Sequence, residues 1–342
     1  MAYTYASSYI SGFEKPVEAI LKSQIKDVVI VKHLDGLIVY KTKLEFSKLQ
    51  LPCFNNTYQV LAMSPTNPKL SYQETLKKFI TQNKPSLSTV LNNIPFSKQK
   101  SFKILSFDGN SPTRIDFSIV KNLEQQIQRE LNLNIGFKKH DFDIVLLRRN
   151  EGLFLLLFKL TYHRLTEKDL NKGELRPELC HILSWISDLK PNNIIIDPFC
   201  GHGSIPKEIV RNFSYNMLFA SDIDCDLINK LKGEFKKNKK NIFIKQRDAL
   251  DLAYFENDFF DNIITDPPWN SYNSQDTDFS IFYSKMFKEF HRILKLNGIC
   301  TILMGNVADF EKVLDFNRFK LLEKYHILVN GKKANVYKLM KA

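Results

Sequence analysis

The sequence has no long apolar segment and few cysteines. Its 342 residues are 44% hydrophobic, close to an ordinary globular protein and enough for two domains. No apolar run reaches the roughly 18 residues that a membrane helix needs, which excludes a helical membrane protein. The first residues lack the basic and apolar parts of a secretory signal, so none is expected. The 5 cysteines form no C-x-x-C pair, which argues against disulfides or a zinc knuckle and favours a reducing cytoplasm.

Positive charge is abundant, and it is unevenly distributed along the chain. The net charge is +12, from 49 Lys and Arg against 37 Asp and Glu. Residues 1–150 carry 21 basic and 12 acidic side chains, a balance of +9, whereas residues 151–342 carry 28 and 25, a balance of +3. A basic surface indicates a polyanionic partner, most often nucleic acid. Abundant solvated lysines would account for the same count, and this alternative stays open.

Strands and helices alternate in the second half of the chain. Short apolar runs predict buried strands at 193–197, 217–222, 242–244, 260–265 and 299–304. Helical patterns separate them: Ser204 is expected to cap one, a second spans 227–235, and a third spans 279–296 and ends at Asn297-Gly298. Asn330-Gly331 between two apolar runs predicts a terminal hairpin. This alternation predicts a parallel sheet with right-handed crossovers, extended by one antiparallel strand.

The first half is expected to be an α+β region built of smaller elements. Alternating or apolar runs predict strands at 3–10, 28–31, 37–40, 143–147 and 153–160. Helical spacing predicts helices at 15–25 and 118–131. Residues 64–114 are rich in Ser, Pro, Asn and Lys, which favours a long loop.

Three acidic residues stand where consecutive predicted strands end. Asp197 begins a turn that contains Gly201 and Gly203, Asp222 ends the second strand, and Asp248 follows the third. The carboxyl ends of parallel strands meet at one edge of the sheet, where open sheets bind their ligands. Glycine lets the backbone approach a nucleotide closely. We therefore expect Asp222 to bind the hydroxyls of a ribose and Asp248 to accept a hydrogen bond from an adenine amine.

The sequence Asp266-Pro267-Pro268-Trp269 ends the fourth predicted strand. The two prolines remove two backbone donors and stiffen the loop. The carboxylate of Asp266 and the carbonyl of Pro267 can then both accept from one exocyclic amino group, which holds its nitrogen tetrahedral and restores its nucleophilicity. Trp269 offers a flat face on which a flipped base can stack. These four residues are the predicted catalytic group.

These segments resemble a known family. Residues 197–206 and 266–269 resemble the S-adenosylmethionine-dependent RNA guanine-N2 methyltransferases that carry a THUMP domain and that modify tRNA. Residues 173–179 resemble the segment that leads into the catalytic domain of that family and touches the cofactor. Residues 5–40 resemble its ferredoxin-like unit, and residues 114–160 resemble the THUMP core only loosely. The resemblance implies a Rossmann-like class I methyltransferase domain, with a seven-stranded sheet and a C-terminal hairpin, preceded by an α+β ferredoxin-like and THUMP-like RNA-binding region.

The resemblance also implies boundaries, a cofactor and a partner. An RNA-binding region would occupy residues 1–165, a linker with a helix 166–190, and the catalytic domain 191–342. The expected reaction is methyl transfer from S-adenosyl-L-methionine to the N2 amine of a guanosine, with tRNA as the expected substrate, in the cytoplasm. The expected cofactor-binding residues are Pro177, Asp197, Phe199, Cys200, Gly201, Gly203, Asp222, Ile223, Asp248 and Ala249. Phosphate contacts are expected from Lys138, Lys139, Arg148 and Arg149, and no metal site is expected because the histidines lack ligand spacing.

Departures from the family pattern leave the target base open. The family usually has Ser and Thr at the positions of His202 and Ser204, Tyr or Phe at Trp269, and Gly at Asn270. The Asp-Pro-Pro-Trp sequence is also similar to that of adenosine methyltransferases, in which the catalytic loop precedes the cofactor loop. Here the order is reversed, which favours guanine. An adenine-amine methyltransferase on RNA or DNA is the alternative, and a non-catalytic cofactor-binding RNA scaffold is a second one. The methylated nucleotide, the number of methyl groups, the oligomeric state and the need for a small activating subunit stay open.

Overall fold

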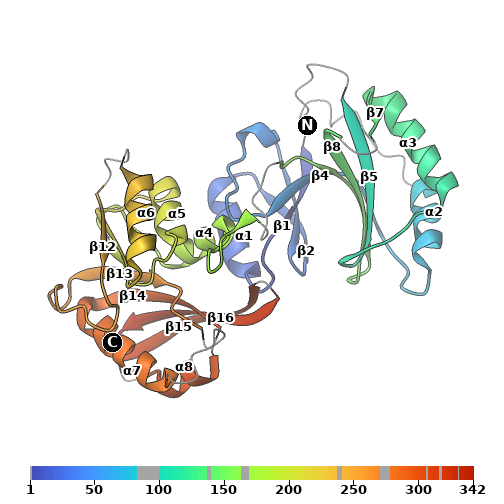
Figure 1. Cartoon of the computed structure of the whole chain (residues 1–342). Helices are drawn as coiled ribbons and strands as arrows, with labels where there is room; N and C mark the ends of the chain where they lie inside the picture. Colours follow the sequence, from blue (N-terminus) through green and yellow to red (C-terminus); the bar gives the residue numbers. More distant parts are fainter. Residues whose placement is uncertain are drawn as a thin grey trace. The chain divides into compact units, whose positions relative to one another are not determined.

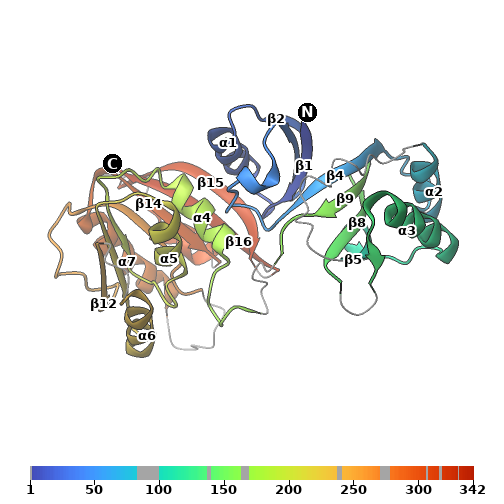
Figure 2. The ribbon, with the colours of Figure 1, turned by 90° about the horizontal axis from the view of Figure 1, so that it is seen from above.

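The computed structural model describes residues 2–82, 100–136, 140–162, 169–236, 241–269, 278–305, 307–315, 318–329 and 331–342. The chain forms two compact units, each with its own sheet (Figures 1 and 2). The first unit comprises Met1–Tyr9 and Leu21–Arg164, and the second comprises Ile10–Ile20 and Leu165–Ala342. The segment Ile10–Ile20, which the sequence-based boundaries placed in the RNA-binding region, is thus grouped with the second unit.

The first unit is built on a mixed sheet of nine strands in the described part of the chain. In the order β2-β3-β1-β4-β9-β8-β5-β6, neighbours are antiparallel except for the parallel pair β5–β8, and β7 pairs with β5 in parallel. The strands are β1 (Tyr3–Ser8), β2 (Val29–Leu34), β3 (Leu37–Thr42), β4 (Asn56–Pro65), β5 (Ser101–Asp108), β6 (Ser111–Pro112), β7 (Asn134–Ile135), β8 (Phe142–Arg149) and β9 (Leu153–Lys159). The helices of this unit in the described residues are η1 (Phe46–Lys48), α2 (Tyr72–Gln82) and α3 (Phe117–Leu131), whereas α1 (Glu14–Gln24) begins in the segment grouped with the second unit and ends in the first.

The long loop predicted for residues 64–114 does not extend over the described parts of that stretch, residues 64–82 and 100–114; residues 83–99 lie outside the described residues. This stretch holds helix α2 and strands β5 and β6. Helix α2 begins with a reciprocal pair of hydrogen bonds, because Ser71 N donates to Glu74 Oε2 and Glu74 N donates to Ser71 Oγ. Phe79 then packs its ring 4.8 Å from that of Phe154 on β9. The stretch is polar overall, but it contains a capping box followed by a helix with an apolar stripe.

The second unit is a seven-stranded sheet in the order β12-β11-β10-β13-β14-β16-β15. Neighbours from β12 to β14 are parallel, and β16 joins β14 and β15 in antiparallel fashion. The strands are β10 (Ile194–Asp197), β11 (Met217–Asp222), β12 (Ile242–Gln246), β13 (Phe260–Thr265), β14 (Leu294–Met304), β15 (Phe319–Val329) and β16 (Lys332–Lys341). The predicted Rossmann-like fold with its terminal hairpin is confirmed.

Helices cover both faces of this sheet. They are α4 (Pro177–Ile186), α5 (Ser204–Asn212), α6 (Cys225–Phe235), α7 (Phe279–Ile293) and α8 (Val307–Val313). Alternate residues of β14 show the two faces: Cys300 belongs to the core formed with α7, whereas the Thr301 hydroxyl bonds Ser187, at the end of α4, at 2.7 Å. Helices α4 to α6 therefore lie on one face, and α7 and α8 lie on the other (Figure 1).

The helix predicted to end at Asn297-Gly298 ends earlier. Helix α7 stops at Ile293, and β14 begins with Leu294. Leu294 pairs with Phe260 and Ile299 pairs with Asn262, so residues 295–298 form a bulge in the ladder. Asn297 takes the left-handed backbone conformation, φ 62°, inside that bulge. The Asn-Gly pair therefore marks a strand irregularity rather than the helix cap.

The start of helix α5 also differs from the prediction. Its N-cap is Gly203, with φ 78°, and Ser204 is the first residue of the helix. The Ser204 hydroxyl instead accepts a hydrogen bond from Leu175 N at 3.2 Å, joining the segment before α4 to the start of α5.

Gly203 provides a test of this local geometry. A Cβ at this position would lie 2.3 Å from Leu231 Cδ1, and the positive φ disfavours any side chain. Gly203→Ala is expected to lower the free energy of unfolding by about 1–3 kcal/mol, measured by denaturant titration. Gly233→Ala, in helix α6 with nothing within 4 Å, is the matched control and is expected to raise it by about 0.5–1 kcal/mol. Equal effects of the two substitutions would contradict the assigned role of Gly203.

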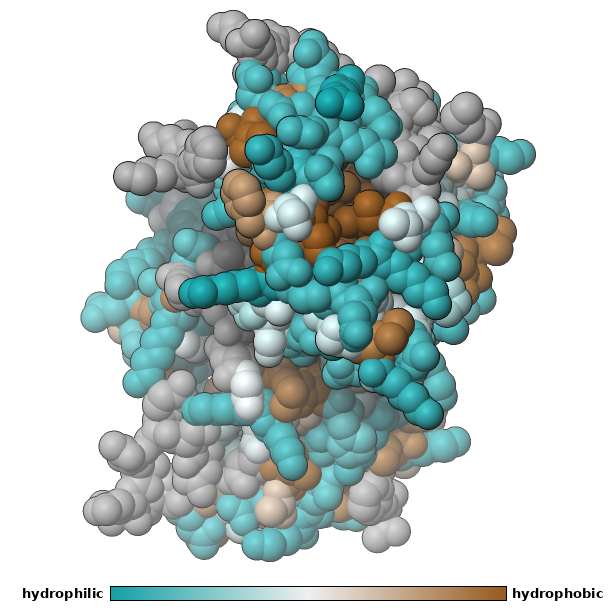
Figure 3. Space-filling model, turned by 90° about the vertical axis from the view of Figure 1, so that its right-hand side faces the viewer, coloured by the Kyte–Doolittle hydropathy of each residue, from teal (hydrophilic) through white to brown (hydrophobic). Residues whose placement is uncertain are grey.

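The surface agrees with the sequence composition. Hydrophilic residues cover most of the face in Figure 3, and hydrophobic residues are visible mainly in recesses between them. In the part of the chain that the structure describes, no helix is long and apolar enough to cross a membrane.

Candidate active site

A cavity of about 390 Å³ opens in the second unit at the carboxyl ends of β10 to β13. Asp222, the last residue of β11, and Asp248 and Asp266, which follow β12 and β13, all line it. The three acidic side chains thus meet at one edge of the sheet, as predicted. All four residues of the segment 266–269 are part of the lining.

The predicted cofactor residues divide into two groups. Six line the cavity: Phe199, Gly201, Asp222, Ile223, Asp248 and Ala249. Four are not part of the lining: Pro177, Asp197, Cys200 and Gly203. Pro177 is the first residue of helix α4, and Cys200 accepts a hydrogen bond from Gly203 N at 2.6 Å. Burial raises the pKa of the Cys200 thiol, which keeps it protonated and argues for a packing role.

Asp222 shapes the turn after β10 and still has acceptor capacity. One of its carboxylate oxygens accepts from Gly201 N at 2.8 Å, and the other accepts from Asp224 N at 3.0 Å. A carboxylate has about four lone-pair positions, so each oxygen can accept a further hydrogen bond. No Cβ stands at Gly201, and nothing lies within 4 Å of where one would be. This donor-poor, acceptor-rich end of the cavity fits a vicinal diol lying close to the backbone.

Asp248 and Ile223 flank that end of the cavity. Asp248 Oδ1 accepts from Leu250 N at 2.9 Å, which orients the side chain at the start of its loop. The Ile223 side chain is 68% exposed although it is apolar, and it lines the cavity. An exposed apolar side chain beside a fixed carboxylate suits a flat heterocycle with an amino group.

Asp197 lies under the cavity rather than in its wall. It is 1% exposed, and its Oδ1 accepts from Thr265 Oγ1 at 2.8 Å and from Phe199 N at 3.2 Å. Burial raises the pKa of the Asp197 carboxyl to about 8, against the opposing effect of those two hydrogen bonds. Because Thr265 directly precedes Asp266, Asp197 joins the end of β10 to the end of β13.

A buried hydrogen bond between side chains joins helices α4 and α5. His181 Nδ1 on α4 lies 2.8 Å from Glu208 Oε1 on α5, and both side chains are almost inaccessible to solvent. Asn212 Nδ2 donates to the same Glu208 oxygen at 2.6 Å. This pair and the Leu175–Ser204 bond hold α4 and α5 together, and with them the lining segments that precede each helix.

The loop after β13 holds the predicted catalytic residues in a fixed arrangement. The indole N–H of Trp269 donates to Asp266 Oδ1 at 2.8 Å, and the Tyr283 hydroxyl donates to the Pro268 carbonyl at 2.8 Å. Burial raises the pKa of the Asp266 carboxyl to about 7, and the indole hydrogen bond opposes that rise. A carboxyl of this kind can be an acceptor or take up a proton near neutral pH.

Several lining residues were not among the predicted site residues. Glu174 and Leu175 lie in residues 173–179, the segment that resembles the family's lead-in to the catalytic domain, where Pro177 is the only predicted site residue. Phe282 comes from helix α7, and Val329 and Lys332 come from the two sides of the hairpin turn. Asn330-Gly331 in the sequence marks that turn, but nothing in the local pattern indicates that its ends face the cavity.

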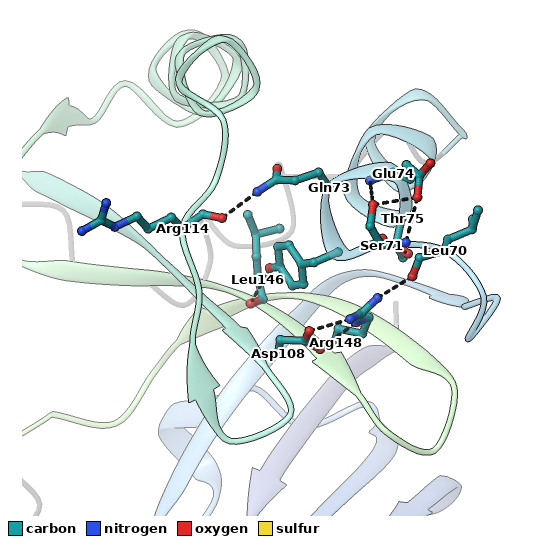
Figure 4. Close-up of polar contacts among 10 residues, drawn as sticks. Leu70, Ser71, Gln73, Glu74, Thr75, Asp108, Arg114, Leu146 and Arg148 are labelled. Carbon is teal, nitrogen blue, oxygen red and sulfur yellow. Dashed lines mark hydrogen bonds and ion pairs between the residues drawn. The ribbon is translucent and has the colours of Figure 1, made fainter.

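The first unit holds the residues expected to contact phosphates. Lys138 and Lys139 lie outside the described residues. Arg148 donates from Nε to Asp108 Oδ1 at 2.7 Å and from Nη1 to the Leu70 carbonyl at 2.9 Å (Figure 4). Arg149 donates to the Asp35 carbonyl and to Glu151. Both arginines thus have internal partners, and their contact with RNA stays a prediction.

Figure 4 also shows how helix α2 is tied to its surroundings. Gln73 Nε2 donates to the Arg114 carbonyl at 2.6 Å, while the Arg114 side chain points away from this cluster. Tyr72 donates from its hydroxyl to the Leu146 carbonyl on β8. The guanidinium of Arg148 lies 5.6 Å from the centre of the Tyr72 ring. These contacts make Arg148 a structural centre between α2, β5 and β8.

A protein-family model matches the second half of the chain. The family model described as "RMKL-like, methyltransferase domain" (UPF0020) matches residues 164–335. A curated relative, the tRNA (guanine(10)-N2)-dimethyltransferase of Methanothermobacter thermautotrophicus, is 26% identical over 173 residues, which are 49% of this chain and 49% of the relative. The chain thus spans about half the length of this curated relative.

Solved structures match over nearly the whole chain. TrmN from Thermus thermophilus has a TM-score of 0.77 at 16% identity, covering 99% of this chain and 100% of TrmN. SMU.472 complexed with SAH has a TM-score of 0.70 at 14% identity, covering 98% of this chain and 97% of SMU.472. At these identities the likeness supports the fold, and the identity of the THUMP-like part stays a prediction.

Proposed function

The chain belongs to the RMKL-like methyltransferase domain family, and on that basis we propose that it transfers a methyl group from S-adenosyl-L-methionine to the N2 amine of a guanosine in tRNA. One observation carries the proposal: Asp222 and Asp248 share a cavity with the intact Asp266-Pro267-Pro268-Trp269 segment. The curated relative acts on guanine N2 of tRNA, as its name states, which supports the choice of base.

The cavity fits the proposed cofactor. Its volume lies within the range of about 300–1,000 Å³ that small-ligand sites occupy. Asp222 would accept hydrogen bonds from the ribose hydroxyls, and Asp248 with Ile223 would hold the adenine. The structure of SMU.472, which shares the fold, contains SAH, the demethylated form of this cofactor. When bound, the cofactor supplies a methyl group on a positively charged sulfur that is already activated for transfer.

The residues after β13 would act on the amine. An exocyclic amine of a purine is a poor nucleophile because its lone pair is delocalised into the ring. The Asp266 carboxylate and the Pro267 carbonyl accept its two N–H groups and direct the lone pair along one line, so that orientation provides most of the acceleration. Asp266, with a pKa of about 7, can then take the proton that the methylated nitrogen releases.

The pH dependence follows from this role. Because only the ionised carboxylate is an acceptor on both oxygens, kcat/KM is expected to rise about tenfold per pH unit below the pKa of Asp266, which is about 7, and to level off above it. Initial rates with saturating cofactor from pH 5.5 to 9 provide the measurement. A flat profile over that range would contradict the role given to Asp266.

The proposed reaction is tested with purified protein, isotope-labelled S-adenosyl-L-methionine and unmodified tRNA. Label in N2-methylguanosine after nucleoside digestion supports the proposal. Label in N6-methyladenosine supports the adenine alternative, which rests on Trp269. Cofactor binding in calorimetry without transfer to any RNA supports the scaffold alternative.

A further inference from the structure

Gly305, the residue after strand β14, lies against the ring of Trp269. A Cβ added to Gly305 would lie 2.1 Å from Trp269 Cε3 and 2.3 Å from Cδ2. Ordinary contacts between carbon atoms are about 3.5–4.0 Å, so any larger residue here would push the ring away by more than about 1 Å. Gly305 has no positive φ to explain its presence. Its function in the structure is therefore to leave space for the indole.

The position of the ring in that space determines a hydrogen bond. With the ring packed on Gly305, the indole Nε1 lies 2.8 Å from Asp266 Oδ1. Within the described residues, this N–H is the donor to the Asp266 carboxylate. Because this N–H occupies one lone-pair position of Oδ1, Oδ2 is the oxygen that keeps both of its lone-pair positions for an incoming amine. The N–H also fixes the carboxylate plane, because rotation about χ2 would break the bond.

We propose that Gly305 and Trp269 act as one positioning device, in which the missing side chain of Gly305 seats the indole so that its N–H orients the Asp266 carboxylate for the target amine. This inference rests on the proposed methyl transfer for its kinetic consequence, but the Gly305–Trp269–Asp266 contact can be measured without any substrate. It assigns Trp269 an orienting role in addition to the stacking expected from the sequence.

Asp266 has other titratable groups near it. Asp197, at the end of β10, and Cys180, on α4, interact with Asp266 through their charges. Burial raises the pKa of both the Asp197 carboxyl and the Cys180 thiol, so neither is expected to titrate below about pH 7. The other titratable groups that line the cavity are Glu174, Asp222, Asp248 and Lys332. The Asp266→Asn variant separates the titration of Asp266 from all of these.

The first experiment uses fluorescence in the absence of substrate. The chain has 2 tryptophans, so Trp185→Phe leaves Trp269 as a single reporter. The emission of this variant is expected to change with a midpoint near the pKa of Asp266, about 7, and Asp266→Asn in the same background is expected to abolish the change. Adding Gly305→Ala is expected to abolish it too, because the ring no longer reaches the carboxylate. Gly233→Ala, the matched control, is expected to retain it.

The second experiment measures methyl transfer. Gly305→Ala is expected to lower kcat by about 10²-fold, since a displacement of about 1 Å in a reacting group costs that much. The KM for the cofactor is expected to stay near the wild-type value, while the overlap with the indole is expected to lower the thermal midpoint of unfolding by several degrees, which leaves the variant folded at the assay temperature. In a Trp269→Leu background, adding Gly305→Ala is expected to lower kcat by less than about twofold, because the effect of Gly305→Ala acts through the indole.

The outcomes separate this inference from the proposed function. A Trp269 transition that Gly305→Ala removes, together with non-additive kinetics, supports the device. Methyl transfer that Gly305→Ala leaves at the wild-type rate overturns the device while the proposed function stands. The fluorescence transition without methyl transfer to any RNA supports the contact but overturns the proposed function. A Gly305→Ala variant that retains the transition overturns the device.

Discussion

Asp266→Ala is expected to reduce methyl transfer to RNA by about 10²–10³-fold, the size of effect seen when a group that stabilises transition-state charge is removed. Asp266 is the carboxylate in the segment after β13, where the cavity wall also includes Pro267 and Trp269. Without it, the target amine has no ionised acceptor and its lone pair stays delocalised. The measurement is the initial rate of label transfer from S-adenosyl-L-methionine into tRNA.

The control for this prediction is a nearby acid outside the cavity. Asp251→Ala removes the same charge from an exposed loop, where Asp251 accepts only from Ala253 N among the described residues, and the variant is expected to retain full activity. Cofactor binding by calorimetry is expected to persist in Asp266→Ala, which shows that the variant is folded. A wild-type rate in Asp266→Ala would remove the basis for the catalytic assignment.

Asp222→Ala is expected to weaken S-adenosyl-L-methionine binding by about 10- to 100-fold, because it removes charge-assisted hydrogen bonds to two hydroxyls. The substitution also removes the acceptor for Gly201 N, so the turn after β10 loses its anchor. Calorimetric titration with the cofactor measures the effect.

Asp224→Ala is the matched control for Asp222→Ala. Asp224 is two residues further on and caps helix α6 by accepting from Asp226 N and Leu227 N, but it does not line the cavity. Its loss is expected to cost about 1 kcal/mol of stability and to leave cofactor affinity unchanged. If both variants bound the cofactor equally well, Asp222 would have no part in binding it.

The catalytic half of the fold could be predicted because its signals are local. Strand β13 has the predicted bounds, Phe260–Thr265, since an apolar run on a strand buried on both faces ends where Asp266-Pro267-Pro268 begins. The strands ending at Asp197 and Asp222 also match. In a parallel sheet these ends meet at one edge, so the shared cavity follows from the chain order alone.

Features that depend on contacts distant in sequence could not be predicted. Gly305 has no local signal, because its role is set by a ring 36 positions earlier in the chain. Asp197 was expected at the cofactor, but its distance from the cavity wall depends on a hydrogen bond to Thr265, 68 positions away. The same holds for Lys332, since the hairpin signal identifies a turn and not the direction in which it faces.

The structure accounts for part of the positive charge in the first half of the chain. The first unit carries most of the positive excess expected for an RNA partner, but Arg148 and Arg149 have internal partners. Arg148 accounts for the link between Asp108 and the start of helix α2 (Figure 4). A contact with phosphates would therefore depend on other basic residues of this unit, and its affinity is expected to fall as salt rises.

The central claim, methylation of a guanine amine in tRNA, is tested most directly by mass mapping of tRNA nucleosides from cells that lack this protein. One N2-methylguanosine is expected to disappear from a defined tRNA position, to return with the wild-type chain, and to stay absent with the Asp266→Ala chain. Full retention of N2-methylguanosine at every position, or loss of N6-methyladenosine in its place, would contradict the account.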